Sequence, residues 1–333
     1  MRNIDELVLR IKETVDNHNL GEVGKYRRWN WASESEEREL GINEYGCADA
    51  ANILYQIGYF ISEPADRKCW VNTLQAMQNP ETGMFTEKTH HTIHTTAHCI
   101  AALELFDAKP LYPVKSLLKY LDEKELDGFL NDLDWINNPW PQSHQGAGLY
   151  VSLLLSGAAD INWIRSYFNW LDDNADPETG MFRKGCVLSG KAPVAHSMGG
   201  TFHYIFNMEN HKRAIKYPEK LIDTCLDLYK NNDIRDDFGK CCGFLEIDWV
   251  YSITRALRQS HHRPADCSAA LTKFKNDYID YLYSVDYKKD ETFNDLHMLF
   301  GATCALAELQ SALPGTIETT RPLKLVLDRR PFI

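Results

Sequence analysis

The stretch that decides the fold is NPETGMF, residues 79–85, which recurs almost unchanged as DPETGMF at residues 176–182. Each copy lies between two segments with the apolar spacing of helices. Proline fixes the backbone angle at such a turn, and glycine adopts a conformation that other residues avoid. The same turn is therefore used twice to connect helices, and this repetition predicts a chain built from helix–turn–helix units.

Six helical hairpins can be traced along the chain by the same apolar spacing. In each hairpin the first helix carries more charge, and the second is richer in alanine, glycine, cysteine and leucine. A helix that is apolar on nearly all sides is usually buried. We therefore expect an all-α chain with one domain, residues 1–333, folded as an (α/α)6 toroid whose second helices surround a central cavity.

The expected helices follow directly from this spacing, with DGF at residues 127–129 as the turn of the third hairpin. The expected pairs are residues 4–17 with 43–60, a helix from about residue 66 with 90–106, 114–121 with 145–155, 161–171 with 196–208, 220–229 with 243–257, and 270–283 with 294–310.

Composition argues against several classes of partner. The formal net charge is −11, which disfavours nucleic acid or an anionic membrane as the main partner. The N-terminal residues carry charges where a signal peptide has its apolar core, and no apolar run reaches the roughly 18 residues of a membrane span. The nine cysteines include no Cys-x-x-Cys pair. A cytoplasmic protein with free thiols is the simplest interpretation.

The repeated turn resembles the inter-helix turn of bacterial unsaturated-glycuronyl hydrolases. It is also similar to the Gly-x-Phe turn of prenyltransferase repeats, which leads into helices similar to TTAHCIAAL at residues 95–103. The resemblance covers about four of the six hairpins. It implies the (α/α) barrel that six-hairpin glycosidases share with terpenoid cyclases and protein prenyltransferases.

The catalytic hallmarks of these families are incomplete. Residues 247–252, IDWVYS, resemble the prenyltransferase segment that supplies the zinc-binding Asp and Cys, and residues 295–297 resemble the segment that supplies the zinc-binding His. Val250 stands in the position of that Cys. Residues 132–135, DLDW, lack the final carboxylate of the class II cyclase motif. No catalytic subfamily is matched, and no metal or other cofactor is expected.

In a toroid of this kind the turns lead into the second helices at one end of the ring, so polar residues at these junctions converge on the cavity mouth. The candidate catalytic carboxylates are Asp248, Asp134 and Asp49. Asp248 is the strongest signal, because a carboxylate in an apolar helix needs a partner or a shifted pKa. An ion pair with Arg255 or another cation is the structural alternative.

The candidate substrate-binding residues supply imidazoles, aromatic faces and one amide at the same junctions. They are His94, His98, Trp135, Trp140, His144, Gln145, His196, Trp249, Tyr251 and His297. His90, His94 and His98 share one helix face, which suits a divalent metal. Because no glutamate accompanies them on that face, hydrogen-bonded histidines are expected instead.

Three functions are compatible with these residues. A carbohydrate-active enzyme would hydrolyse or lyse a glycosidic bond in an oligosaccharide, and we expect this function. A terpenoid cyclase or prenyltransferase-like enzyme and a non-catalytic binding or scaffold toroid are the alternatives. Two carboxylates about 5–10 Å apart in an open cleft would indicate a glycosidase. One acid in an aromatic pocket would indicate terpenoid chemistry, and a filled cavity would indicate a scaffold.

Overall fold

The computed structural model describes residues 1–33 and 37–333. Nearly all of its regular structure is helical, and two short strands, β1 (Arg2–Asn3) and β2 (Ile317–Glu318), pair in parallel. The expectation of an all-α protein is confirmed. Within the described residues, no helix is both long and apolar enough to cross a membrane.

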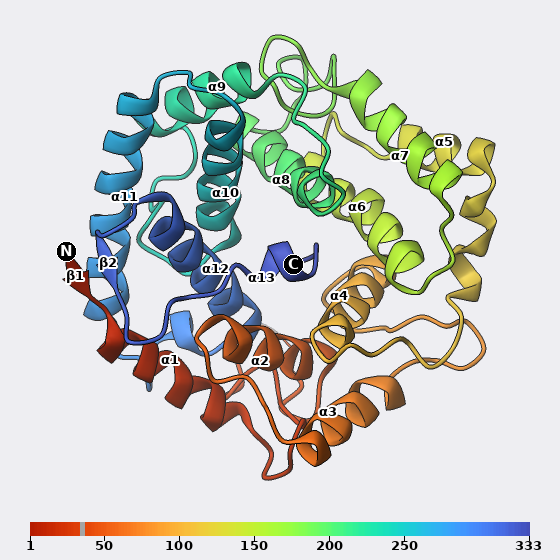
Figure 1. Cartoon of the computed structure of the whole chain (residues 1–333), viewed down its shortest axis with the longest axis vertical. Helices are drawn as coiled ribbons and strands as arrows, with labels where there is room; N and C mark the ends of the chain where they lie inside the picture. Colours follow the sequence, from red (N-terminus) through yellow and green to blue (C-terminus); the bar gives the residue numbers. More distant parts are fainter. Residues whose placement is uncertain (34–36) are drawn as a thin grey trace.

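Figure 1 shows an inner and an outer set of helices. The inner helices are α2 (Glu44–Gln56), α4 (Thr92–Glu104), α6 (Pro139–Leu155), α8 (Val194–Asn210), α10 (Phe244–Gln259) and α12 (Leu296–Ala312). The outer helices are α1 (Asp5–His18), α3 (Pro64–Ala76), α5 (Glu123–Asp132), α7 (Ile161–Asn174), α9 (Pro218–Lys230) and α11 (Pro264–Ser284). Each inner helix packs against the next inner helix, and α12 packs back against α2, so these contacts form a closed cycle.

Burial explains which helices lie inside. Residues 93–103 of α4 and residues 197–208 of α8 are all buried. In the outer helix α3, by contrast, the buried residues are Trp70 and Leu74. Helices without a polar face can only be accommodated where other helices cover them on every side. In each hairpin, the first and more charged helix is therefore an outer helix, and the second and more apolar helix is an inner helix.

The two copies of the repeated turn make the same hydrogen bonds. The first side chain, Asn79 or Asp176, accepts from the backbone N–H groups of the third and fourth residues. The last N–H of each copy donates to a threonine hydroxyl on an inner helix. The acceptor is Thr96 of α4 at 3.0 Å in the first copy and Thr201 of α8 at 2.9 Å in the second. Each turn is thus fastened to the helix that follows it.

The glycine of each copy is required by the backbone. Gly83 has a φ of +76° and Gly180 a φ of +73°. A Cβ atom at Gly180 would also lie 2.4 Å from the backbone nitrogen of Leu221 in α9. The second turn therefore packs directly on an outer helix, and a side chain at Gly180 would force the two segments apart.

The third hairpin differs from the expectation. Residues 127–129 lie inside α5, so the turn expected there is wrong. The Asp122 side chain caps the helix by accepting from two N–H groups of its first turn, and Leu126 and Leu130 are buried one turn apart. A glycine inside a helix costs about 1 kcal/mol relative to alanine, whereas burying a leucine contributes about 1.5–3 kcal/mol. The segment before α5 is a 3₁₀ helix, η1 (Lys115–Leu121).

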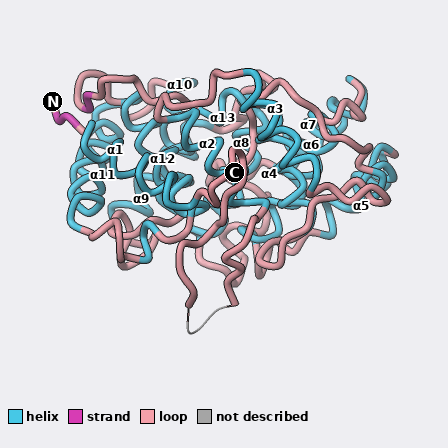
Figure 2. The backbone as a smooth tube through the Cα atoms, turned by 90° about the horizontal axis from the view of Figure 1, so that it is seen from below, coloured by secondary structure: helices cyan, strands magenta, loops and turns pink. Residues whose placement is uncertain are grey.

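The last residues run into the middle of the molecule, where the C-terminus lies in both Figure 1 and Figure 2. The short helix α13 (Val326–Arg329) packs against α8 and α2. Beyond it, Phe332 and Ile333 are buried. Asp328 of α13 forms a 2.6 Å ion pair with the buried Arg255 of α10. Packing and an ion pair therefore hold residues 326–333, the C-terminal tail, inside the cycle of inner helices.

Two glycines test how much the contact at the repeated turn contributes. Gly180 and Gly185 both have positive φ, +73° and +78°, but a Cβ at Gly185 would meet no atom within 4 Å. Gly185→Ala should therefore cost only the backbone strain of about 1–2 kcal/mol. Gly180→Ala should cost more, about 2–4 kcal/mol in free energy of unfolding, because it adds a steric clash. Denaturant unfolding of both variants measures the difference, and equal losses would contradict this packing.

Candidate functional site

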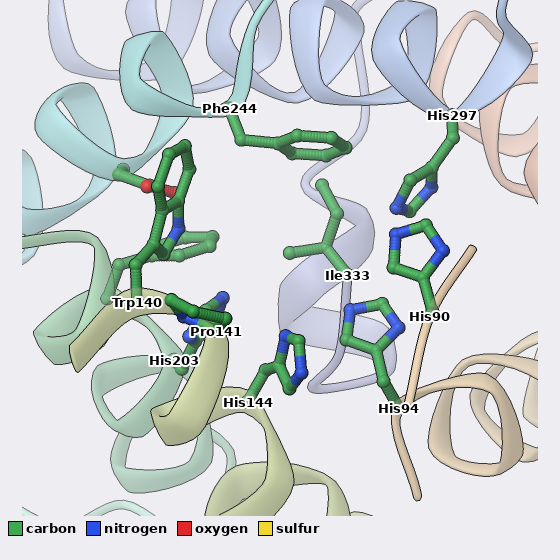
Figure 3. Close-up of a pocket in the computed structure, with 11 residues that line it drawn as sticks. His90, His94, Trp140, Pro141, His144, His203, Phe244, His297 and Ile333 are labelled. Atoms are coloured by element: carbon green, nitrogen blue, oxygen red, sulfur yellow. The ribbon is translucent and has the colours of Figure 1, made fainter. Parts of the chain in front are cut away.

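A cavity of about 300 Å3 lies between five of the inner helices, and several of its lining residues come from their first turns (Figure 3). Its walls come from α4, α6, α8, α10 and α12, and its floor includes the C-terminal tail. The lining residues are His90, His94, Trp140, Pro141, His144, Phe202, His203, Phe244, Asp248, His297 and Ile333. Five imidazoles and one carboxyl group thus face a small, otherwise apolar space.

Asp248 is a buried acid in the cavity wall. Its side chain has no exposed surface, and neither carboxyl oxygen has a hydrogen-bond partner among the described residues. A Cβ at Gly199 would lie 2.7 Å from Asp248 Oδ2 and 2.7 Å from a ring carbon of Trp140, so glycine leaves the space that the carboxyl group occupies. Burial, and then the charge of Glu246, raise the pKa of Asp248 well above its ordinary value. Burial thus favours the protonated form of this carboxyl group.

The alternative explanation of Asp248 as an ion-pair partner of Arg255 is wrong. Arg255 instead binds Glu308, Asp328 and Glu209 at the other end of α10. These ion pairs engage the two terminal nitrogens of Arg255, and none of them involves Asp248.

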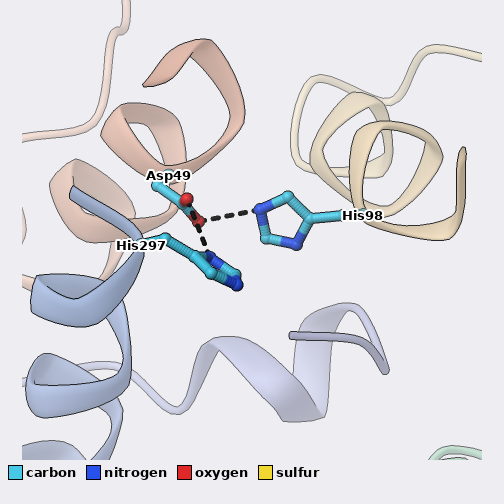
Figure 4. Close-up of side chains that lie close together, drawn as sticks. All are labelled: Asp49, His98 and His297. Carbon is cyan, nitrogen blue, oxygen red and sulfur yellow. Dashed lines mark hydrogen bonds and ion pairs between the residues drawn. The ribbon is translucent and has the colours of Figure 1, made fainter. Parts of the chain in front are cut away.

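Asp49 lies behind the opposite wall and binds two imidazoles (Figure 4). Its Oδ1 accepts from Nε2 of His98 at 2.8 Å, and its Oδ2 accepts from Nδ1 of His297 at 3.0 Å. Burial opposes ionisation of Asp49, but the two imidazoles outweigh it and hold the pKa of Asp49 well below its ordinary value. Burial lowers the pKa of His297 to about 3, although Asp49 opposes this shift. Asp49 is therefore ionised, and His297 is neutral with its proton on Nδ1.

This bond determines what His297 can do. Because Asp49 holds the proton on Nδ1, Nε2 carries the free lone pair. Nε2 is therefore the nitrogen that can accept a proton from a molecule in the cavity. A carboxylate in this position also stabilises the imidazolium that forms when Nε2 takes up a proton. His297 thus has the arrangement of a general base.

His203 is fixed in the same way on the wall that carries Trp140. The Ser143 hydroxyl donates to the backbone oxygen of Trp140 at 2.9 Å, so it accepts from Nδ1 of His203 at 2.8 Å. Burial lowers the pKa of His203 to about 3. Its Nε2 is therefore a second unprotonated nitrogen available to the cavity.

His90 and His94 are also held at Nδ1. Thr89 donates its hydroxyl proton to Glu87 at 2.6 Å and lies 2.7 Å from Nδ1 of His90. The hydroxyl of Tyr45 lies 2.6 Å from Nδ1 of His94. Burial lowers the pKa of both imidazoles, most strongly that of His94. The imidazoles are thus oriented from behind rather than left free to rotate.

The structure brings together part of the predicted site. Of the predicted residues, those that line the cavity are Asp248, His94, Trp140, His144 and His297. Asp49 and His98 lie directly behind the wall. The other lining residues, which are outside the predicted catalytic and substrate-binding sets, are His90, Pro141, Phe202, His203, Phe244 and Ile333. Ile333 has no signal in the sequence, since only the path of the tail brings it there.

Asp134 lies at the surface, away from the cavity. Its carboxylate accepts hydrogen bonds from Asn137 and Asn138 and caps a turn. Asp134 therefore has a structural role in this turn and is not one of the acids that line the cavity.

Five other predicted binding residues do not line the cavity. Trp135 packs on Tyr204, and the Trp249 N–H donates to the backbone of Cys225 in the core. Tyr251 lies under the guanidinium of Arg255. The two others are Gln145, which is partly buried, and His196, which lies beside Trp140.

One group of described residues could hold a metal ion. A ligand atom from each of Asp49, His98 and His297 lies within 4.8 Å of the other two, and all three side chains are buried. These residues are bound to one another by hydrogen bonds in this structure.

Comparison of the chain with protein-family models, curated proteins and solved structures found no match. Function must therefore be inferred from the fold and from the chemistry of the cavity.

The buried imidazoles make stability depend on pH. Because the pKa of His203 is about 3 in the folded chain against an ordinary value of 6.5, the unfolded chain binds a proton between these values that the folded chain does not. The free energy of unfolding should therefore fall as the pH is lowered through this range, by up to about 1.4 kcal/mol per pH unit from this group. In denaturant titrations, His203→Gln should show a shallower pH dependence than the unmodified chain, whereas a variant of the exposed His261 should not. Parallel curves for all three would contradict a neutral, buried His203.

Proposed function

We propose that the chain forms the (α/α)6 toroid of six hairpins, α1–α2 to α11–α12. The closed cycle of contacts among the inner helices supports this arrangement. The position of the odd-numbered helices outside that cycle in Figure 1 supports it as well. The cavity then lies at the end of the toroid where the inner helices begin, as expected for a site built at the junctions between turns and inner helices.

We propose that the protein is a carbohydrate lyase that cleaves the terminal unit of a uronic-acid-containing oligosaccharide in this cavity. The observation that carries the proposal is Asp248, a buried carboxyl group without a hydrogen-bond partner among the described residues, in a wall that also carries five neutral imidazoles. An acid and a base with well-separated pKa values in one cavity are what proton-transfer catalysis requires. The volume of about 300 Å3 is at the small end of ligand sites and suits a single sugar unit.

A lyase fits the cavity better than a hydrolase with two carboxylates. Asp248 is the one carboxyl side chain among the lining residues. Asp49 is engaged by two imidazoles, and Asp134 lies at the surface. A glycosidase needs two carboxyl groups on either side of the scissile bond. Elimination needs one base and one acid, and both are present.

In the proposed reaction, His297 and Asp248 each carry out one proton transfer. Nε2 of His297 takes the proton from the carbon beside the sugar carboxylate, and the electron pair of that bond forms a carbon–carbon double bond. The bond from the neighbouring carbon to the glycosidic oxygen breaks, and Asp248 donates its proton to the departing oxygen. The positive ends of the inner helices face the substrate and favour its carboxylate. Proton exchange with solvent restores both residues.

Terpenoid chemistry is the second candidate, because one acid and three aromatic side chains, Trp140, Phe202 and Phe244, line the cavity. Aromatic faces stabilise carbocations. The unprotonated imidazoles oppose this use, since a neutral imidazole removes a proton from a carbocation and ends the reaction early. The lyase is therefore the better-supported function.

Asp248→Asn tests the acid directly. The variant should keep the fold and lose about 10²–10⁴-fold in kcat, the contribution of general acid catalysis. The assay follows the ultraviolet absorbance of the new double bond with a panel of uronate oligosaccharides. Asp134→Asn, a substitution of the same kind at the surface, should leave turnover unchanged. Full turnover by Asp248→Asn would remove the acid from the mechanism, and a wild-type protein that cleaves none of the panel would contradict the lyase.

A further inference from the structure

Asp49, His98 and His297 come from three different inner helices, α2, α4 and α12, and their side chains converge behind the cavity wall (Figure 4). One ligand atom from each lies within 4.8 Å of the others. We propose that this triad binds a divalent transition-metal ion of the zinc type, and that the bound ion switches the cavity off. The binding is independent of the proposed function, whereas the switching rests on it.

The donor set determines the class of ion. Two neutral imidazoles and one ionised carboxylate suit zinc and its transition-metal neighbours, whereas calcium and magnesium require oxygen ligands. Two ligands of a tetrahedral zinc ion lie about 3.3 Å apart, given bond lengths of 2.0–2.1 Å. The two N···O distances around Asp49 are 2.8 and 3.0 Å. Each of these N···O distances would therefore have to widen by only a few tenths of an ångström when an ion replaces the bridging proton.

Each proton that the ion displaces can move to the other nitrogen of the same imidazole ring. When Nε2 of His98 binds the ion, its proton moves to Nδ1, which has no hydrogen-bond partner among the described residues. When Nδ1 of His297 binds the ion, its proton moves to Nε2. Both imidazoles stay neutral, so no proton is gained or lost. The tautomer of each ring changes and its charge does not.

This change of tautomer disables the base. Nε2 of His297 then carries a proton and points it into the cavity, where it can donate a hydrogen bond but cannot remove a proton from a substrate. An ion in this position is therefore inhibitory. A catalytic zinc, by contrast, keeps an open position toward its substrate.

Access and charge set the expected affinity. His297 both lines the cavity and belongs to the triad, so its ring is what separates an ion in the cavity from Asp49 and His98. The buried Arg330 acts on Asp49 with its positive charge and competes with the ion for the same carboxylate. Binding should therefore be reversible by a chelator, unlike that of a structural zinc site.

The binding experiment uses the full chain, without an affinity tag and treated with a chelator, titrated with zinc chloride in a calorimeter. One zinc ion per chain should bind, and Asp49→Asn and His98→Gln should each weaken binding by at least about tenfold, since even outer partners of a ligand contribute 10–100-fold. His196→Gln, a histidine outside the triad, should bind as the unmodified chain does. Absence of one-to-one binding, or equal binding by the triad variants, would overturn the site.

Cobalt chloride gives a readout that needs no variant. Cobalt held by two imidazoles and a carboxylate in a closed, buried site should show the intense visible absorption of low-coordinate cobalt, and excess zinc should remove it. Absorption like that of the hydrated ion would overturn the site even if the variants fail to fold.

A third experiment tests the metal site and the proposed function separately. Zinc should abolish lyase turnover of the unmodified chain, and a chelator should restore it. Binding without loss of turnover would overturn the switch and the role of His297 as base, and would leave the metal site intact. If the chain binds no zinc and zinc does not change its turnover, the metal site is overturned and the lyase is left intact.

Discussion

An ionised carboxylate with no exposed surface lies where the last inner helix meets the first. Burying such a charge costs several kcal/mol unless hydrogen bonds replace its water. His98 and His297 supply these bonds to Asp49 at 2.8 and 3.0 Å. Because the three residues belong to α2, α4 and α12, the same contact joins the helices that close the cycle and fixes the tautomer of His297. The fold and the chemistry of the cavity therefore depend on one carboxylate.

Two aspartates on opposite sides of the cavity show how the surroundings of a carboxyl group determine its pKa. Asp49 and Asp248 are both buried aspartates, yet the pKa of the first is lowered and the pKa of the second is raised. Asp49 has two imidazole N–H groups to accept from, whereas Asp248 has no partner among the described residues. The backbone at Gly199 leaves space for the uncharged group. An acid and a neutral base can therefore coexist within one small space.

The parts of the fold that depend on local chemistry could be predicted from the sequence. Residues 79–85 repeat because their hydrogen bonds lie mostly within the turn, and apolar spacing locates the helices. Residues 127–129 were misassigned, because burial of two leucines outweighs the turn preference of a glycine. Asp248 was found through its apolar neighbours. Asp134 could not be distinguished from it in the sequence, since the hydrogen bonds from Asn137 and Asn138 that place it in a surface turn depend on the folded backbone. Ile333 depends wholly on tertiary packing.

The position of the C-terminal tail limits how a ligand can move through the molecule. Arg330, Phe332 and Ile333 are all buried within the cycle of inner helices, so the tail fills the middle of that cycle. For the proposed lyase, a polymer would then not pass through the centre of the molecule and be cut in its middle. Its substrate and product would share one mouth of the cavity, which favours trimming from a chain end, one unit at a time, over processive movement along a polymer.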